Sequence, residues 1–209
     1  MSIAEIFSVG GFLTNRTILV WFSAIHIGAI VATAWVLMLN AIVGYQLLDD
    51  GTVKSVGLVT GSAFVFFVGT AYIALDTGFN YTGTFEVTNA YPFKNYALYI
   101  MYLLFPLIMI VAYFILESVL VIKVLGEMLP MKRLVAAVLL FAIGQIFSFV
   151  ISVHLCNATS GKIDGSLFET AFTLCAVVML WFFWSSITED GWPDDPMHPM
   201  MSESGMSYP

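Results

Sequence analysis

The charged residues of this chain stand in clusters that are separated by long apolar stretches. Five stretches contain no Asp, Glu, Lys or Arg, and they cover residues 17–48, 55–75, 95–116, 134–161 and 170–188. Because a helix rises about 1.5 Å per residue, about 20 apolar residues cross the roughly 30 Å hydrocarbon core of a bilayer. The pattern therefore predicts an all-α fold, a polytopic membrane helical bundle with about five transmembrane helices.

The polar positions between these stretches set the expected bounds of the spans. The first three spans are expected at Thr17–Leu48, Ser55–Leu75 and Asn95–Lys123. The last two form a hairpin around the polar turn Cys156–Ser166. Pro106 lies inside the third span, and we expect a kink there because proline has no backbone N–H to donate.

Small residues recur at helical spacing in the first two spans. They are Ala24, Gly28 and Ala32 in the first span, and Gly57, Gly61 and Gly69 in the second. Stripes of this kind let a second helix approach closely. We therefore expect both stripes to be packing grooves.

The composition agrees with a membrane protein and separates a tail from the rest. The chain is 60% hydrophobic and 10% charged, whereas a soluble domain has about 25% charged residues. Residues 1–190 are predicted to form a single transmembrane bundle, and residues 191–209 an acidic, Pro/Met-rich tail that is disordered and cytosolic. The net charge of −7 is concentrated near this tail, which argues against nucleic acid as a partner.

Charges and glycosylation sequons together predict the orientation. Four basic residues fall on the side of the C-terminus and three on the other side, which is a weak positive-inside signal. The three Asn-x-Ser/Thr sequons, at Asn15, Asn80 and Asn157, all fall on the less basic side. We therefore expect a lumenal N-terminus and a cytosolic C-terminus, with Asn80 in the longest loop as the candidate glycosylation site.

Two polar side chains inside the spans could carry chemistry. Glu117 is the only acid well inside a predicted span, where a charge is costly. It could be a structural carboxylate bonded to a neighbouring helix, a contact to a partner protein, or a proton relay. Gln145 lies near the middle of the fourth span, where polar side chains most often link helices.

Cofactor and metal sites are weakly supported. His26 and His154 could ligate a haem, and the tail residues Met197, His198, Met200 and Met201 could bind copper(I). Helix-bonding histidines and a flexible tail account for these residues more simply, so no cofactor is expected. The sequence also contains no HExxH motif and no phosphate-binding glycine loop. We therefore expect a protein that is not an enzyme and whose partner is another membrane protein.

Two segments carry a family resemblance. Asn40–Thr52 (NAIVGYQLLDDGT) resembles a segment of the fungal chitin synthase export chaperone family. The last two predicted spans are similar to those of the same family, and the matching positions are Gly144-Gln145, Cys156-Asn157, the run Asp164–Phe168, Phe183-Trp184 and Ser186–Thr188. The resemblance covers about residues 40–190, and the short stretch before the first motif suggests a shortened member or a paralogue.

This resemblance implies a non-catalytic membrane chaperone of the endoplasmic reticulum. It implies a polytopic client of the chitin synthase type, whose folding and exit from the endoplasmic reticulum the protein supports. The alternatives are a permanent accessory subunit of another membrane complex and a small proton-coupled transporter that uses Glu117. The expected partner-binding residues are Gln46, Asp49, Asp50, Gly51, Glu117, Gln145, Asp164 and Trp184.

Overall fold

The computed structural model describes residue 7 and residues 14–45, 51–85, 95–158 and 165–188, and all regular structure in these ranges is helical. The α-helices are α2 (Arg16–Gly44), α3 (Val53–Phe79), α4 (Tyr96–Tyr99), α5 (Phe105–Val119), α6 (Met128–Ile146), α7 (Ser152–Ala158) and α8 (Gly165–Thr188). Three π-helical turns join some of them, namely η1 (Ile100–Leu104), η2 (Leu120–Leu125) and η3 (Phe147–Ile151).

Five helical segments of the described residues are long and apolar enough to cross a membrane. They are Arg16–Gly44, Val53–Phe79, Tyr96–Leu125, Met128–Ala158 and Gly165–Ile187. This confirms the predicted all-α fold with five spans. The chain divides into two compact parts, Met1–Leu125 and Gly126–Pro209, and each is described by itself. The single bundle over residues 1–190 and the tail over residues 191–209 stay predictions.

Asparagine and threonine side chains mark several helix ends. Asn15, Thr52 and Asn95 each accept a hydrogen bond from a backbone N–H in the first turn of α2, α3 and α4. These bonds satisfy donors that a helix start leaves without a partner. Asn80 ends α3 in the left-handed conformation, with φ of 54°, and its N–H donates to the carbonyl of Asp76 at 2.7 Å.

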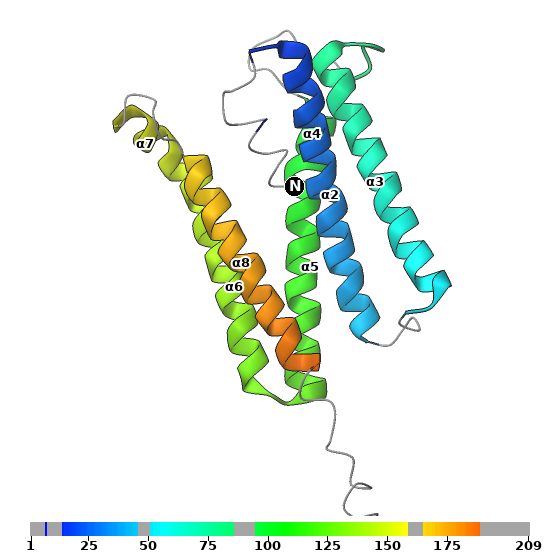
Figure 1. The fold of residues 1–209 in the computed structure, drawn as a ribbon, viewed down its shortest axis with the longest axis vertical. Coiled ribbons are helices and arrows are strands. Elements are labelled where there is room, and N and C mark those ends of the chain that lie inside the picture. The colour runs from blue at the N-terminus through cyan, green and yellow to red at the C-terminus, as the bar shows by residue number, and fades with distance from the viewer. Residues whose placement is uncertain (1–6, 8–13, 46–50, 86–94, 159–164, 189–209) are drawn as a thin grey trace, which may run out of the picture. The chain divides into compact units, whose positions relative to one another are not determined.

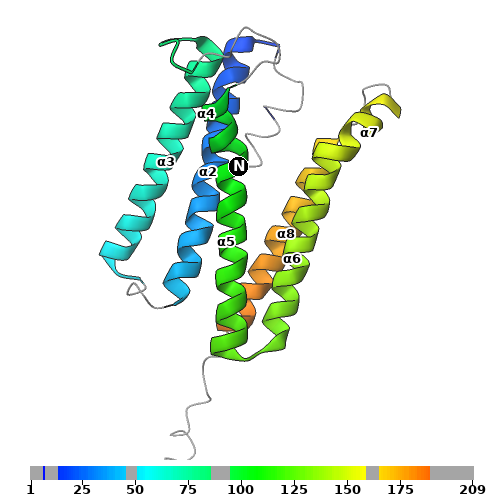
Figure 2. The same ribbon diagram turned by 180° about the vertical axis from the view of Figure 1, so that it is seen from behind.

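In the first part, α2 lies between α3 and α5 (Figures 1 and 2). An aromatic cluster joins the three helices, with ring centroids 4.7 Å apart for Trp35 and Phe66 and 5.0 Å apart for Phe66 and Phe105. The indole N–H of Trp35 also donates to the hydroxyl of Ser62 at 2.9 Å. This bond gives the polar end of a half-buried ring its partner and holds α2 in one rotation against α3.

Two glycines bring α2 and α3 into close contact. A Cβ added at Gly28 would lie 2.9 Å from the carbonyl oxygen of Phe67, and one added at Gly78 would clash with Val20. The groove expected around Gly28 is therefore confirmed, and Ala24 in the same stripe is buried.

The groove expected on the second span does not pack within the described residues. A Cβ added at Gly57, Gly61 or Gly69 would meet nothing within 4 Å. No other helix of the described residues therefore packs on these three glycines, and the expected packing groove stays a prediction. The physical reason is the rotation of α3, which turns Thr70 and Ala74 inward and these glycines outward.

The third span is not a continuous α-helix. The π-helical turn η1 ends immediately before Phe105, and Pro106 is buried in the first turn of α5. A proline is tolerated there because the first turn of a helix needs no N–H donor from that residue. The proline thus coincides with a change of helical hydrogen bonding, and the kink expected at Pro106 stays a prediction.

In the second part, α6 and α8 lie side by side (Figures 1 and 2). Gly144 of α6 packs against α8, because a Cβ there would lie 3.2 Å from Cβ of Phe172 and 3.3 Å from the carbonyl oxygen of Glu169. Gly165 starts α8 against the carbonyl of Phe147, and its N–H donates to the hydroxyl of Ser152 at 3.0 Å. Small residues thus determine how closely this hairpin packs.

The two kinds of glycine predict opposite effects of adding one methyl group. Gly28→Ala should lower the free energy of unfolding by about 1–3 kcal/mol, because a backbone atom of Phe67 would have to move. Gly61→Ala, the matched control, should raise it by up to about 1 kcal/mol through helix propensity alone. Thermal unfolding in detergent, followed by circular dichroism, measures both, and equal effects would contradict this packing.

Candidate functional site

The structure places five of the nine residues that the sequence singled out. Gln46, Asp49, Asp50 and Asp164 lie outside the described residues. Gly51, Glu117 and Asn80 are in the first part of the chain, and Gln145 and Trp184 are in the second. Gly51 is exposed just before α3 and has φ of 72°, a conformation that favours glycine.

The end of α2 contacts α5 beside Glu117. The hydroxyl of Tyr45 donates to the carbonyl of Leu116 at 2.6 Å, and a Cβ added at Gly44 would lie 3.3 Å from Leu120. Gly44 and Tyr45 belong to the segment that carries the family resemblance. The structure therefore joins this segment to the helix that carries Glu117, a pairing that the sequence did not predict.

Glu117 is fully enclosed in the structure. Its side chain is 0% exposed, and within the described residues neither carboxyl oxygen has a hydrogen-bond partner. The expected bond to a neighbouring helix is therefore not among the contacts of the described residues. A buried polar group without a partner is costly, so Glu117 is the most unusual side chain of this part.

Gln145 links the two helices of the second part. Its amide nitrogen donates to a carboxyl oxygen of Glu169 in α8, with a donor to acceptor distance of 3.3 Å. This contact is the helix-linking role expected for a polar residue in a span. The sequence did not predict this partner, because Glu169 lies just before the charge-free stretch of residues 170–188.

A second buried acid, Asp76, was also missed. The predicted second span ends at Leu75, yet Asp76 lies inside α3 and is 0% exposed. Its carboxylate accepts hydrogen bonds from the N–H of Thr82 at 2.7 Å, the hydroxyl of Thr82 at 2.9 Å and the N–H of Phe85 at 3.2 Å. These donors replace water and make the burial of the charge possible.

Asn95 completes this arrangement from the start of the third span. Its amide nitrogen donates to the hydroxyl of Thr77 and to the carbonyl of Phe85, both at 2.8 Å. We call Asp76, Thr77, Thr82, Phe85 and Asn95 the Asp76 clasp. The clasp ties the end of α3, the chain that follows it and the start of α4 into one structure.

Two predicted residues within the described ranges remain, Trp184 and Asn80. Trp184 is half-buried in α8, with its ring 5.8 Å from that of Phe183. Asn80 is exposed at the end of α3. Among the described residues, no group of three or more His, Cys, Asp or Glu side chains could hold a metal ion.

The fold and these contacts define a class of protein, namely a polytopic all-helical protein with polar groups enclosed between apolar spans. The sequence model of the family described as "Chitin synthase export chaperone" matches residues 1–197. The chain belongs to this family. The family is one of export chaperones and not of enzymes, in agreement with the expectation from the sequence.

Curated relatives with the same description come from several fungi. The chain is 31% identical to that of Cryptococcus neoformans var. neoformans over 179 residues, which cover 85% of this chain and 48% of the relative. It is 31% identical to that of Aspergillus fumigatus over 170 residues, which cover 81% and 50%. The chain thus spans about half the length of the curated relatives it matches. No solved structure matches it.

The Asp76 clasp makes a direct prediction. Asp76→Asn keeps the shape but turns an amide N–H₂ toward groups that are themselves donors, so part of the clasp should open. The amides of Thr82 and Phe85 should then exchange hydrogen about tenfold faster or more. Hydrogen exchange with mass spectrometry measures this change.

Thr82→Val is the matched control, because it removes one hydroxyl and keeps the carboxylate. It should accelerate exchange at Phe85 less than Asp76→Asn does. Unchanged protection in Asp76→Asn would show that the carboxylate does not hold this segment.

Proposed function

We propose that the chain is a non-catalytic membrane chaperone that binds a polytopic membrane enzyme of the chitin synthase type. It supports the folding of this client and its exit from the endoplasmic reticulum. The observation that carries the proposal is the family match over residues 1–197, together with relatives that are described as chitin synthase export chaperones.

The physical chemistry of the described residues supports this role. An unassembled polytopic client exposes polar groups and small-residue surfaces within the bilayer, where each lacks a partner. The chain offers groups of the same kind. The glycines of α3 are open, and the hydroxyls of Thr70 and Ser118 join Glu117 as buried polar atoms that have no partner within the described residues.

The proposed partner contacts are the residues that the sequence singled out. In the sequence, Gln46, Asp49, Asp50 and Gly51 come directly after Tyr45, whose hydroxyl donates to the carbonyl of Leu116. Gln145, Asp164 and Trp184 belong to the second part. Glu117 is enclosed in the free chain, so a client reaches it only where a neighbouring helix gives way.

The proposed location is the endoplasmic reticulum membrane, with the N-terminus in the lumen and the C-terminal tail in the cytosol. The distribution of basic residues and the shared side of the three sequons support this orientation. Asn80 is exposed at the end of α3, which supports its choice as the glycosylation site.

Affinity purification tests the chaperone role. The tagged chain is isolated from its native membranes in mild detergent, and the proteins that accompany it are quantified by mass spectrometry. A chitin synthase should be recovered with the wild-type chain. Glu117→Leu should lower its recovery roughly fivefold, since one polar contact in a membrane is worth about 1 kcal/mol.

Two further variants show whether a lower recovery comes from the lost hydrogen-bonding capacity of Glu117. Glu117→Gln keeps the hydrogen-bonding capacity and should retain the client, and Val119→Ala changes an exposed position of the same helix and should have no effect. Stoichiometric recovery of another membrane complex would instead indicate an accessory subunit. With no partner at all, a proton-coupled flux that Glu117→Gln abolishes would identify a transporter.

The orientation predicts a glycan on Asn80. Endoglycosidase treatment of the protein from its native membranes should increase the gel mobility of the wild-type chain, and Asn80→Gln should remove that shift. A sequon added to the C-terminal tail should stay unmodified, since the tail is expected in the cytosol. Modification of the added sequon would reverse the proposed orientation.

A further inference from the structure

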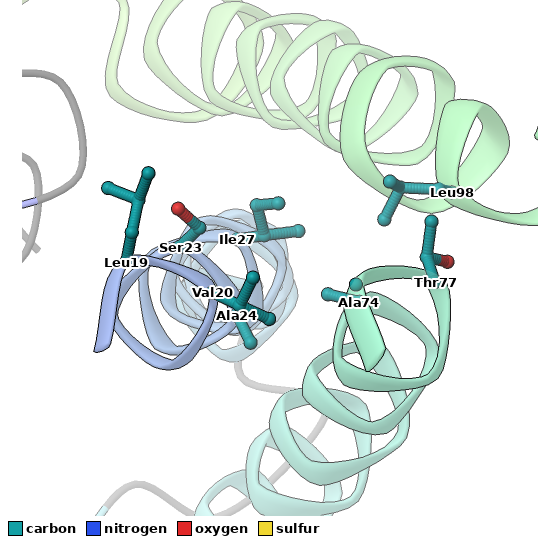
Figure 3. Close-up of a pocket in the computed structure, with 9 residues that line it drawn as sticks. Leu19, Val20, Ser23, Ala24, Ile27, Ala74, Thr77 and Leu98 are labelled. Carbon is teal, nitrogen blue, oxygen red and sulfur yellow. The ribbon is translucent and has the colours of Figure 1, made fainter. Parts of the chain in front are cut away.

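The first part of the chain contains an apolar cavity between α2, α3 and α4. Its volume is about 210 Å³, and Figure 3 shows Ala24 and Ala74 on its walls, contributed by two different helices. Both alanines are buried, with 1% and 8% of their surfaces exposed. An engineered apolar cavity of about 150 Å³ in a soluble protein holds a benzene molecule, so this cavity has room for a short hydrocarbon segment.

The cavity persists because α2 and α3 touch on both sides of it. On one side Gly78 packs against Val20, and on the other Gly28 packs against the carbonyl of Phe67. Ala24 and Ala74 lie between these two contacts along their helices, and their methyl groups are too short to fill the space. The helices cannot move together there without a clash at one of the two glycines.

The chemistry of the walls selects an apolar occupant. Among the described wall residues, Ser23 and Thr77 carry a hydroxyl, and the others are aliphatic or glycine. The hydroxyl of Thr77 is already engaged, since it donates to the carbonyl of Ile73 at 2.7 Å and accepts from Asn95 at 2.8 Å. A charged or strongly polar group would therefore lose its water without gaining partners.

We propose that this cavity binds the acyl chain of a membrane phospholipid. Helices α2 and α3 are both long and apolar enough to cross a membrane, which brings lipid tails within reach of the open side of the cavity. The cavity is partly open, which gives a chain a route of entry. An empty cavity forfeits dispersion contacts along its walls, and a lipid tail restores them. None of the described wall residues is among the proposed client contacts.

Photolabelling tests this site on the full chain. The purified protein is placed in phosphatidylcholine vesicles in which some lipids carry a diazirine on one acyl chain, and labelled residues are mapped by mass spectrometry. The wild-type chain should be labelled on the cavity walls, at Ala24 and Ala74 or next to them. Phe64 and Val65, which are exposed on α3, should be labelled as surface positions.

Filling the cavity should abolish labelling of the cavity walls and leave labelling of the surface positions unchanged. Ala74→Leu should lower labelling of the α2 wall about fivefold or more, because a leucine occupies much of the space, and should leave Phe64 and Val65 unchanged. Ala142→Leu adds the same bulk at an exposed position of α6 and should change neither. If Ala74→Leu loses its helical circular dichroism signal, Ala24→Val replaces it in the test, because it fills the cavity from the opposite wall.

Three results would overturn the proposal. The first is a wild-type chain without labels on the cavity walls, and the second is wall labelling that either filled variant retains. The third is labelling of the walls by a diazirine sterol but not by the acyl-chain probe, which would assign the cavity to a different lipid.

Discussion

Polar groups placed in hydrocarbon must find their partners inside the protein, because the bilayer core offers none. Most of the contacts described above follow from this constraint. Tyr45 bonds the carbonyl of Leu116, Trp35 bonds Ser62, and Gln145 bonds Glu169. Each bond joins two different helices, or two ends of spans that are distant in sequence. The same groups that would be costly alone therefore determine which helices lie together.

Close approach of the helix backbones is a second requirement for helices to pack in a membrane. In a membrane, lipid tails compete equally with aliphatic side chains, so helices gain from packing only where small residues let them come near. Gly28 serves α2 and α3 in this way, and Gly144 and Gly165 serve α6 and α8. The two parts of the chain thus use the same device, a glycine beside a carbonyl oxygen of the neighbouring helix.

The five spans could be predicted from the sequence because the absence of charge over 20 residues is a long-range signal that needs no partner. The end of α3 was misplaced because Asp76 was read as a boundary. Its burial depends on Thr82 and Phe85, which return to it only once the chain has turned. Likewise, spacing alone could not show which glycine stripe packs, since that depends on the rotation of α3 about its axis.

The site was only partly predictable for a related reason. Glu117 and Gln145 could be found because a polar residue in an apolar run is conspicuous. Tyr45 could not, because its partner Leu116 is 71 residues away and the pairing depends on which helices are neighbours. The contacts expected from the family resemblance stay predictions, and four of these residues, Gln46, Asp49, Asp50 and Asp164, lie outside the described residues.

The Asp76 clasp has a consequence for the timing of events during synthesis. The hydroxyl of Thr82 is the third position of the sequon that begins at Asn80, and in the folded chain it is bonded to Asp76. Attachment of a sugar and closure of the clasp therefore draw on the same side chain. Under the proposed lumenal orientation, the fraction of molecules glycosylated at Asn80 would report whether the transferase acted before or after this segment had folded.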